Sequence, residues 1–181
     1  MPWEIDFLNG IQVWLSNPVT DTFFRYFTLL GDPICFIVMI AAMVFPNRTR
    51  KIALQMGFAM LLGVLIGNLI IKNAVARPRP YTRPNALITA ADLLIKQPSD
   101  YSFPSGHTLA SFNCALCLFY NRKGWGALAL FGAAMIAFSR MFVFVHYPTD
   151  IIGGIVLAAV TSLVSFYVTK ALFARYNVTK R

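Results

Sequence analysis

At 181 residues the chain has room for one domain, and 57% of it is hydrophobic while only 13% is charged. Soluble domains are about 45–50% apolar and about 25% charged, so the composition favours a single membrane-embedded domain over residues 1–181. The net charge of +9 would suit a nucleic-acid binder, but the basic residues fall in short clusters between long apolar runs. That layout is typical of the loops of a membrane protein, and we expect no nucleic-acid partner.

The N-terminal segment, residues 1–17, mixes apolar and polar positions and contains Trp3 and Trp14. It is too short and too mixed to span a bilayer, so we predict an interfacial helix anchored by its tryptophans. The apolar run that follows, 23–45, is broken at Gly31-Asp32-Pro33. Arg25 lies about two helical turns before Asp32 and could pair with it; alternatively, Asp32 marks strain near the substrate entrance.

Four further apolar runs cover residues 52–71, 105–120, 125–139 and 151–168. The first is long enough to cross a hydrocarbon core of about 30 Å. The second and third are shorter, which indicates a recessed end of the bundle or helices that continue past the flanking charges. We predict an all-α fold, a polytopic membrane bundle of five to six helices, the sixth depending on whether the N-terminal segment crosses.

The long connection, residues 81–103, follows the first of these four runs. Its apolar residues recur at helical spacing and are Leu87, Ile88, Ala91, Leu94 and Ile95. We therefore predict a short amphipathic helix in this loop, lying on the membrane surface.

Charge separates the two ends of the predicted bundle. With five spans, the loops at 46–51 and 121–124 share one side with the C-terminus, and these segments contain no acidic residue. Their basic residues are Arg48, Arg50, Lys51, Arg122, Lys123, Lys170, Arg175, Lys180 and Arg181. The positive-inside rule places this side in the cytoplasm. We expect a multi-pass protein of the plasma or inner membrane, with its other end facing the periplasm or exterior.

Three polar segments reach that outer end, and they cover residues 72–80, 101–107 and 139–150. Lys72, Arg79 and Arg140 can give charge-assisted hydrogen bonds to the oxygens of a phosphoryl group. Ser105 and the backbone N–H of Gly106 stand at a predicted helix N-terminus, which is a ready anion site. The pattern predicts a phosphate-binding cradle.

Two histidines suit two different roles beside this cradle. Asp150 lies four residues after His146 and could accept a hydrogen bond from its ring, leaving the other nitrogen free to attack phosphorus. His107 is then the candidate to protonate the leaving oxygen, and hydrolysis of the phosphohistidine would complete turnover. We expect no metal and no other cofactor, because the sequence has no acidic cluster that could hold divalent cations.

The three segments resemble the signature of the type 2 phosphatidic acid phosphatase and vanadium haloperoxidase superfamily. The matching residues, in the same order, are Lys72 to Arg79-Pro80, then Pro104-Ser105-Gly106-His107, then Ser139-Arg140 to His146 and Asp150. The resemblance implies a helical bundle of the membrane branch, similar to undecaprenyl diphosphatases or phosphatidylglycerophosphatases. It also implies that His146 is the nucleophile and His107 the general acid. The phosphate-binding residues that it implies are Lys72, Arg79, Ser105, Gly106 and Arg140.

These features predict a metal-independent membrane lipid phosphatase. Among the substrates of similar enzymes, undecaprenyl diphosphate is favoured, because a polyprenyl carrier is released at the outer face and must be recycled. Phosphatidylglycerol phosphate and phosphatidic acid are alternatives, as is a lipid phosphotransferase in which an alcohol replaces water. A lipid-phosphate transporter is the non-enzymatic alternative. Arg77 and Arg83 are interpreted as surface or headgroup contacts, and the pattern gives no prediction of oligomeric state.

Overall fold

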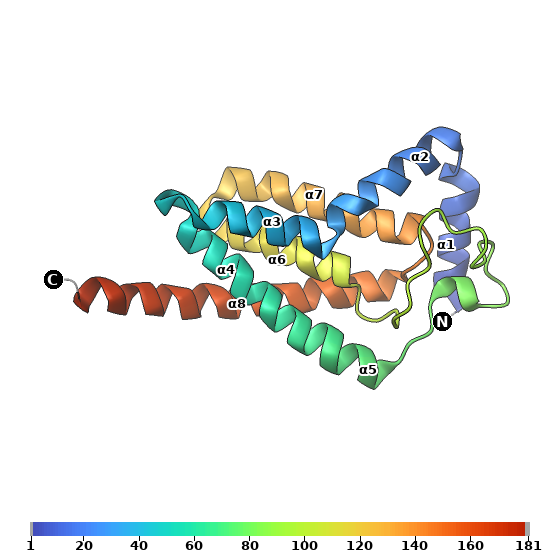
Figure 1. Cartoon of the computed structure of the whole chain (residues 1–181). Coiled ribbons are helices and arrows are strands. Elements are labelled where there is room, and N and C mark those ends of the chain that lie inside the picture. Colours follow the sequence, from blue (N-terminus) through green and yellow to red (C-terminus); the bar gives the residue numbers. More distant parts are fainter. Residues whose placement is uncertain (1, 180–181) are drawn as a thin grey trace.

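The computed structural model describes residues 2–179 and consists of helices packed into a bundle (Figure 1). The long helices are α3 (Pro33–Val44), α4 (Asn47–Gly63), α6 (Gly106–Asn121), α7 (Lys123–Phe142) and α8 (Pro148–Thr179). Helix α6 packs against α3, α4, α7 and α8, and it is therefore the central helix. No β-strand occurs among the described residues. The predicted all-α bundle is confirmed.

Within residues 2–179, three helical stretches are long and apolar enough to cross a membrane, namely Asn47–Thr82, Lys123–Phe142 and Pro148–Ala174. The bent pair Pro18–Gly31 and Pro33–Val44 adds a fourth if its two halves form one span. Helices α7 and α8 both extend beyond the apolar runs from which they were predicted. Helix α7 continues past the charged residues that flank its apolar run. This is one of the two alternatives that the short run suggested, the other being a recessed end of the bundle.

The bend between Pro18–Gly31 and Pro33–Val44 coincides with Gly31-Asp32-Pro33, which breaks the apolar run 23–45. Helix α2 (Pro18–Phe27) continues into a 3-10 turn, Thr28–Gly31, and the two halves meet at 49°. The Asp32 carboxylate caps α3 by accepting a hydrogen bond of 3.1 Å from the backbone N–H two residues on. Pro33 occupies the first helical position, where proline costs no hydrogen bond. Asp32 is thus a helix cap, and the suggested ion pair with Arg25 is not formed.

Polar side chains join the helices inside the bundle. Asn113 of α6 donates to the Ala59 carbonyl of α4 at 3.1 Å and accepts from Thr161 of α8 at 2.8 Å. Ser165 of α8 donates to the Gln55 carbonyl of α4 at 2.7 Å. Because apolar side chains gain little by leaving lipid for protein, such hydrogen bonds fix which helices are neighbours.

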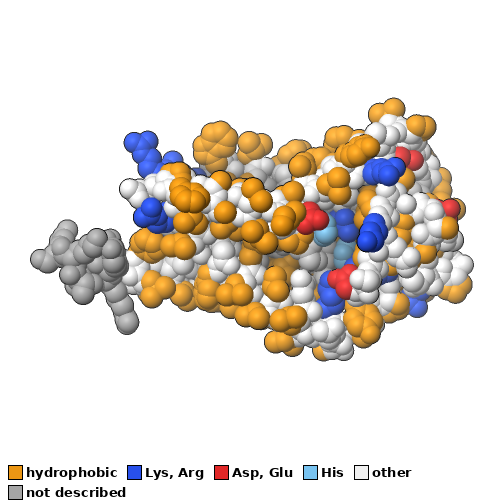
Figure 2. Space-filling view, viewed as in Figure 1, with side chains coloured by type: hydrophobic (Ala, Val, Ile, Leu, Met, Phe, Trp, Pro, Cys, Tyr) orange, Lys and Arg blue, Asp and Glu red, His pale blue; other side chains and the backbone are white. Residues whose placement is uncertain are grey.

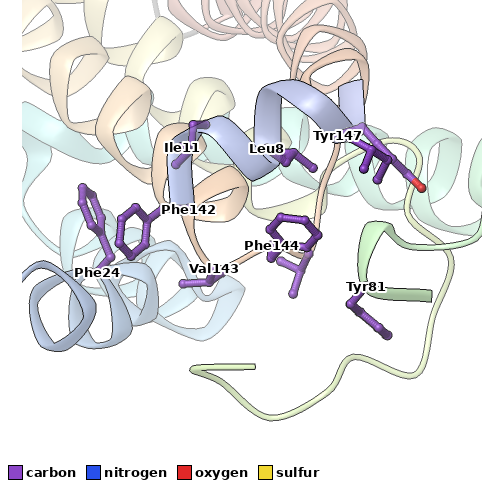
Figure 3. Close-up of a cluster of buried hydrophobic side chains, with 10 residues drawn as sticks. Leu8, Ile11, Phe24, Tyr81, Phe142, Val143, Phe144 and Tyr147 are labelled. Carbon is purple, nitrogen blue, oxygen red and sulfur yellow. The ribbon is translucent and has the colours of Figure 1, made fainter. Parts of the chain in front are cut away.

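Helix α1 (Pro2–Leu15) lies across one end of the bundle, where a separate apolar cluster forms (Figures 1 and 3). Its Leu8 and Ile11 side chains pack with Phe142 at the end of α7 and with Phe144 in the connection to α8, both of which are fully buried. The predicted N-terminal helix is confirmed, and its position at the membrane interface stays a prediction.

The prediction of a short amphipathic helix within residues 81–103 is wrong. After a 3-10 turn, Pro80–Thr82, the chain runs through turns and irregular structure until α6. The Asn9 side chain of α1 forms hydrogen bonds with the backbone of this loop. It donates to the Asn85 carbonyl at 3.0 Å and accepts from the Leu87 N–H at 2.9 Å. The loop's apolar residues that pack on the cluster beneath α1 are Ala86, Ile88, Leu93, Leu94 and Ile95. The spacing of these apolar residues therefore reflects their packing on the cluster beneath α1. These tertiary contacts, and not a helical face, determine the conformation of the loop.

The polar segments and the basic loops lie at opposite ends of the bundle. In Figure 1 the α3–α4 and α6–α7 turns and the C-terminus mark one end, while α1 and the loop before α6 mark the other. This two-ended arrangement is the one that the five-span prediction requires. Which end faces the cytoplasm stays a prediction.

Candidate active site

The first signature segment begins where the α4 stretch ends. A π-helical segment, Val64–Ile71, leads into the short α5 (Lys72–Val75), and π-helical turns recur at functional sites. Ala76 follows in the left-handed conformation, with φ 47°, and ends the helix. This sharp turn allows Lys72 and Arg79 to reach the same carboxylate.

That carboxylate belongs to Asp100, which sequence reasoning missed. Its Oδ2 lies 2.5 Å from Lys72 Nζ and its Oδ1 lies 2.6 Å from Arg79 Nη2. Both cations are buried, whereas the Asp100 side chain is 52% exposed. Burial raises the pKa of Asp100, but the hydrogen bonds and charges of Lys72 and Arg79 outweigh it and lower the pKa to about 2. One carboxylate therefore bridges two of the cations expected to bind phosphate.

Arg79 is held in place by backbone carbonyls as well. Its Nε donates to the Asp100 carbonyl at 2.9 Å, and its Nη1 donates to the Val145 carbonyl at 2.8 Å. The same Nη1 lies 3.4 Å from Nε2 of His146. Arg79 thus reaches the expected nucleophile directly.

Ser105 and Gly106 form the N-terminus of α6, as predicted. The Ser105 side chain is buried and accepts a hydrogen bond of 3.0 Å from the Thr108 hydroxyl, and its backbone N–H donates to the Asp150 carbonyl at 3.1 Å. A Cβ built on Gly106 would lie 3.5 Å from Oδ1 of Asn68, an atom that is buried and has no partner in the described part of the chain. Asn68 is a second residue that sequence reasoning missed.

Arg140 reaches the site from α7 and is buried. Its Nη1 donates to the Thr28 hydroxyl at 2.7 Å, at the bend between α2 and α3. Its Nε is buried and finds no hydrogen-bond partner among residues 2–179. A buried guanidinium with an unused donor is costly to maintain, so the geometry favours an anionic ligand beside it.

His146 lies in the tight connection between α7 and α8. Phe144 before it has φ 60°, a conformation that is strained for a bulky residue and that occurs most often at functional sites. The His146 Nδ1 lies 3.4 Å from Oδ2 of Asp150, as the sequence spacing suggested. Burial and the charges of Arg79 and Arg140 together lower the pKa of His146 to about 4, despite the opposing effect of the Asp150 hydrogen bond. The unliganded ring is therefore neutral at pH 7.

His107 lies on the first turn of α6 and lines the same pocket as His146. Its ring packs against the bend, because a Cβ built on Gly31 would lie 3.1 Å from the His107 Cδ2. The two histidines therefore line one cavity, His107 from α6 and His146 from the connection between α7 and α8.

The interpretation of Arg77 as a surface or headgroup contact is wrong, because its side chain lies between two buried carboxylates. Its guanidinium lies 2.5 Å from Oδ1 of Asp150 and 2.6 Å from Oε2 of Glu4, and both carboxylates are fully buried. It also stacks on the Tyr147 ring, 3.8 Å from the centroid. Thr149 donates to the other Glu4 oxygen at 2.6 Å. Burial raises the pKa of Glu4, but the Thr149 hydrogen bond and the Arg77 charge outweigh it and lower the pKa.

Arg83, in contrast, is exposed, in keeping with a surface position, and its Nε donates to the Tyr147 hydroxyl at 3.1 Å. The remaining Asp150 oxygen, Oδ2, accepts from the Ser102 hydroxyl and from the Tyr147 N–H at 2.9 Å. Asp150 is consequently fixed from several sides and can hold His146 in one orientation.

These side chains surround one open cavity of about 480 Å³ at the end of the bundle. Figure 2 shows histidine side chains at the bottom of a hollow, with basic and acidic side chains around it. The signature residues that line the cavity are Lys72, Arg79, Gly106, His107, Arg140 and His146. Asp150 lies behind His146 and Ser105 lies behind Gly106. The structure therefore brings all the predicted site residues together.

No three His, Cys, Asp or Glu side chains converge in the part of the chain that the structure describes. Cys114 and Cys117 lie in an apolar cluster with Ile52, Met56 and Ala59, where they fill space between helices.

The protein has helices that can span a membrane, and four cations and two histidines line the cavity at one end of them. These features define a multi-pass membrane protein with a basic pocket that suits an anionic group. Residues 52–174 match the PAP2 superfamily, and this match covers more than half of the chain. The chain belongs to the PAP2 superfamily and is a phosphatase.

Relatives of known name support this assignment. The undecaprenyl-diphosphatase of Sulfolobus acidocaldarius is 29% identical over 90% of this chain and 71% of its own length. Undecaprenyl-diphosphatase BcrC of Bacillus subtilis is 32% identical over 83% of this chain and 75% of its own length. The lipid A 4'-phosphatase of Porphyromonas gingivalis is 31% identical, with 93% and 71% covered.

Solved structures show the same fold. The crystal structure of Aquifex aeolicus LpxE matches with a TM-score of 0.75 at 24% identity, over 91% of this chain and 95% of that one. A PAP2 phosphatidylglycerolphosphate phosphatase from Bacillus subtilis matches with a TM-score of 0.69 at 22% identity, over 96% and 86%.

Proposed function

We propose that this chain is a metal-independent lipid phosphatase that hydrolyses a lipid phosphate or diphosphate through a phosphohistidine at His146. The observation that carries the proposal is the position of His146. Its Nδ1 faces Asp150 and its Nε2 faces Arg79, each at 3.4 Å, in the cavity that Lys72 and Arg140 also line. A neutral ring held in this way presents one lone pair to an anion bound by the cations.

The proposed reaction has two steps. In the first, Nε2 of His146 bonds to phosphorus, the bond from phosphorus to the leaving oxygen breaks, and His107 gives its proton to that oxygen. In the second, water attacks the phosphohistidine while His107 takes a proton from it, and phosphate leaves with His146 restored. Lys72, Arg79, Arg140, Ser105 and the Gly106 N–H would stabilise the charge on the phosphoryl oxygens in both steps.

Undecaprenyl diphosphate is the proposed substrate. Two of the relatives reported above bear the name undecaprenyl-diphosphatase, and the large cavity opens among apolar helices. Phosphatidylglycerol phosphate and phosphatidic acid are the alternative substrates. We place the site on the periplasmic or exterior side of the plasma membrane, because the basic loops lie at the other end of the bundle.

The decisive experiment measures phosphate release from a panel of lipid phosphates and diphosphates in detergent, with EDTA present. Wild type is compared with His146→Ala and His107→Ala, and Lys170→Ala at the far end of the bundle serves as the control. We expect release by wild type and the control and loss of it in both histidine variants. Activity retained by His146→Ala would refute the mechanism, and a requirement for added Mg²⁺ would refute metal independence.

Two measurements separate the remaining alternatives. Product analysis with an added acceptor alcohol identifies a phosphotransferase, in which the alcohol and not water takes the phosphoryl group. A lipid-phosphate transporter predicts no phosphate release from any lipid and normal function in His146→Ala. A C-terminal tag that is accessible from outside the cell would contradict the orientation.

A further inference from the structure

The catalytic cavity continues into a second groove that the family signature does not describe. This groove, of about 370 Å³, shares Leu29, Ile95 and Lys96 with the wall of the catalytic cavity. Arg25 and Tyr26 of α2 complete its far side. A ligand in the cradle can therefore extend past Lys96 toward α2 without leaving the protein surface.

The two cations of this groove differ from those of the cradle. Lys72 and Arg79 are buried and bound to Asp100, whereas Lys96 and Arg25 are exposed. Neither Lys96 nor Arg25 has an acidic partner within 4.0 Å among the described residues. Figure 2 shows basic side chains on the rim of the hollow that contains the histidines. These charges remain available to a ligand.

The other walls of the groove are apolar. Leu93 and Leu94 line it from the loop before α6, opposite Tyr26 and Leu29 of the bent α2 segment. Tyr26 of α2 and Leu29 of the 3-10 turn after it are 62% and 53% exposed, and α2 carries further exposed apolar residues. A groove with a charged side and an apolar side fits a group that joins a phosphate to a hydrocarbon chain.

We propose that Lys96 and Arg25 bind the second, lipid-linked phosphate of a diphosphate substrate while the terminal phosphate occupies the cradle. The proposal rests on the proposed function and makes it specific, because it selects lipid diphosphates over monophosphates. The first part of the lipid chain would lie along Tyr26, Leu29 and Leu94. A monophosphate of the same lipid would fill the cradle and leave this subsite empty.

The test compares farnesyl diphosphate with farnesyl phosphate, which share one hydrocarbon chain. Lys96→Gln and Arg25→Gln each remove one exposed charge, and Lys170→Gln at the other end of the bundle is the matched control. We expect kcat/KM for the diphosphate to fall about fivefold in each subsite variant, the size of an exposed charge interaction, while the monophosphate value changes little. Equal losses on both substrates, or no loss on either, would overturn the proposal.

A second readout does not depend on turnover. Calorimetric binding of inorganic pyrophosphate and inorganic phosphate to wild type and the same variants reports the subsite alone. A wild-type preference for pyrophosphate that is lost in Lys96→Gln and Arg25→Gln supports the subsite even if no lipid is hydrolysed. Equal affinities for the two anions in wild type would overturn it. Failure of the proposed function alone would appear as absent hydrolysis with this preference intact.

An independent observation concerns Glu4, which lies outside the segment that matches the family. The contacts run from Glu4 to Arg77 at 2.6 Å, from Arg77 to Asp150 at 2.5 Å, and from Asp150 to His146 at 3.4 Å. Glu4 and Asp150 are both fully buried, so these charges act on each other with little screening by water.

The charges along this chain suggest what Glu4 contributes. With Glu4, the group of Glu4, Arg77 and Asp150 has a net charge of −1. Without Glu4, Arg77 would cancel the Asp150 charge and leave His146 without a counter-charge as it gains positive character on bonding to phosphorus. We infer that Glu4 and Arg77 are positioning residues that orient Asp150 and keep the group anionic.

Glu4→Gln tests this role, with Asp6→Asn on the exposed face of the same helix as the control. We expect kcat to fall about tenfold with KM within twofold, because Glu4 does not contact the substrate, and we expect no change in the control. Arg77→Lys keeps the charge but cannot reach both carboxylates, so its kcat should also fall. Unchanged kcat in Glu4→Gln, or a rise in KM alone, would overturn the inference. A variant that misfolds is recognised by its lower thermal unfolding temperature, and Arg77→Lys then decides.

Discussion

Replacing Asp100 with asparagine should tighten the binding of phosphate-like anions. In the unliganded protein the Asp100 carboxylate holds Lys72 and Arg79, one oxygen on each. A substrate phosphate that uses these cations must first displace that carboxylate. Asparagine has the same shape and no charge, so it should compete far less well.

The magnitude follows from the pKa of Asp100. A shift from 3.8 to about 2 corresponds to roughly 2.4 kcal/mol of interaction with the charged form. Because the side chain is 52% exposed, solvent screening reduces this to about 1 kcal/mol. We therefore expect about fivefold tighter binding of an anion that replaces the carboxylate. The same ion pair contributes to folding stability fully above pH 3.8, and its contribution is lost as the pH falls through about 2.

The assay is competitive inhibition by inorganic phosphate or orthovanadate in detergent at low salt, with Asp92→Asn in the same loop as the control. The inhibition constant should fall about fivefold for Asp100→Asn and stay unchanged for the control. Weaker inhibition in Asp100→Asn would refute the reasoning, because it would mean that Asp100 positions the cations for phosphate and does not compete with it.

Three further outcomes are expected. Gly126→Ala should lower the free energy of unfolding by about 2 kcal/mol, measured by thermal unfolding in detergent, because a Cβ there would lie 2.1 Å from the backbone of Phe119. Gly132→Ala on the same helix has no atom within 4 Å and should not destabilise; equal effects at both sites would contradict the packing argument. Since the pKa of His146 is lowered to about 4, the acid limb of kcat/KM, corrected for substrate ionisation, should lie near pH 4, and a limb near 6.5 would contradict this. Ala76→Gly should raise the free energy of unfolding by about 0.5 kcal/mol, because alanine is strained at φ 47°, and a loss of stability would argue against strain there.

The sequence was sufficient for the signature residues because they stand at or near the ends of helices with a recognisable start or stop. Ser105 and Gly106 open a helix, and Lys72 precedes a proline-rich turn. Once the helices are assigned to an antiparallel bundle, the signature segments are expected to lie at the same end of it. The spacing of His146 and Asp150 likewise predicted a contact within one turn.

Residues that act through distant partners could not be found in this way. Glu4 meets Arg77 across 73 positions, and Asp100 meets Lys72 across 28, and no local pattern encodes such pairs. The loop 81–103 failed for a related reason, because its apolar residues follow the surface beneath α1 and not a helical face. The position of Glu4 between the apolar residues Trp3 and Ile5 was at most a weak local signal.

The bend between α2 and α3 bears on how water reaches the reaction. A helix can break at membrane depth only where its freed backbone groups meet protein or a water-filled space. Thr28, Leu29, Asp32 and Pro33 at this break all line the catalytic cavity. The hydration that such a break requires therefore lies beside the histidines. In the proposed mechanism, the water that hydrolyses the phosphohistidine would enter through the cavity beside this break.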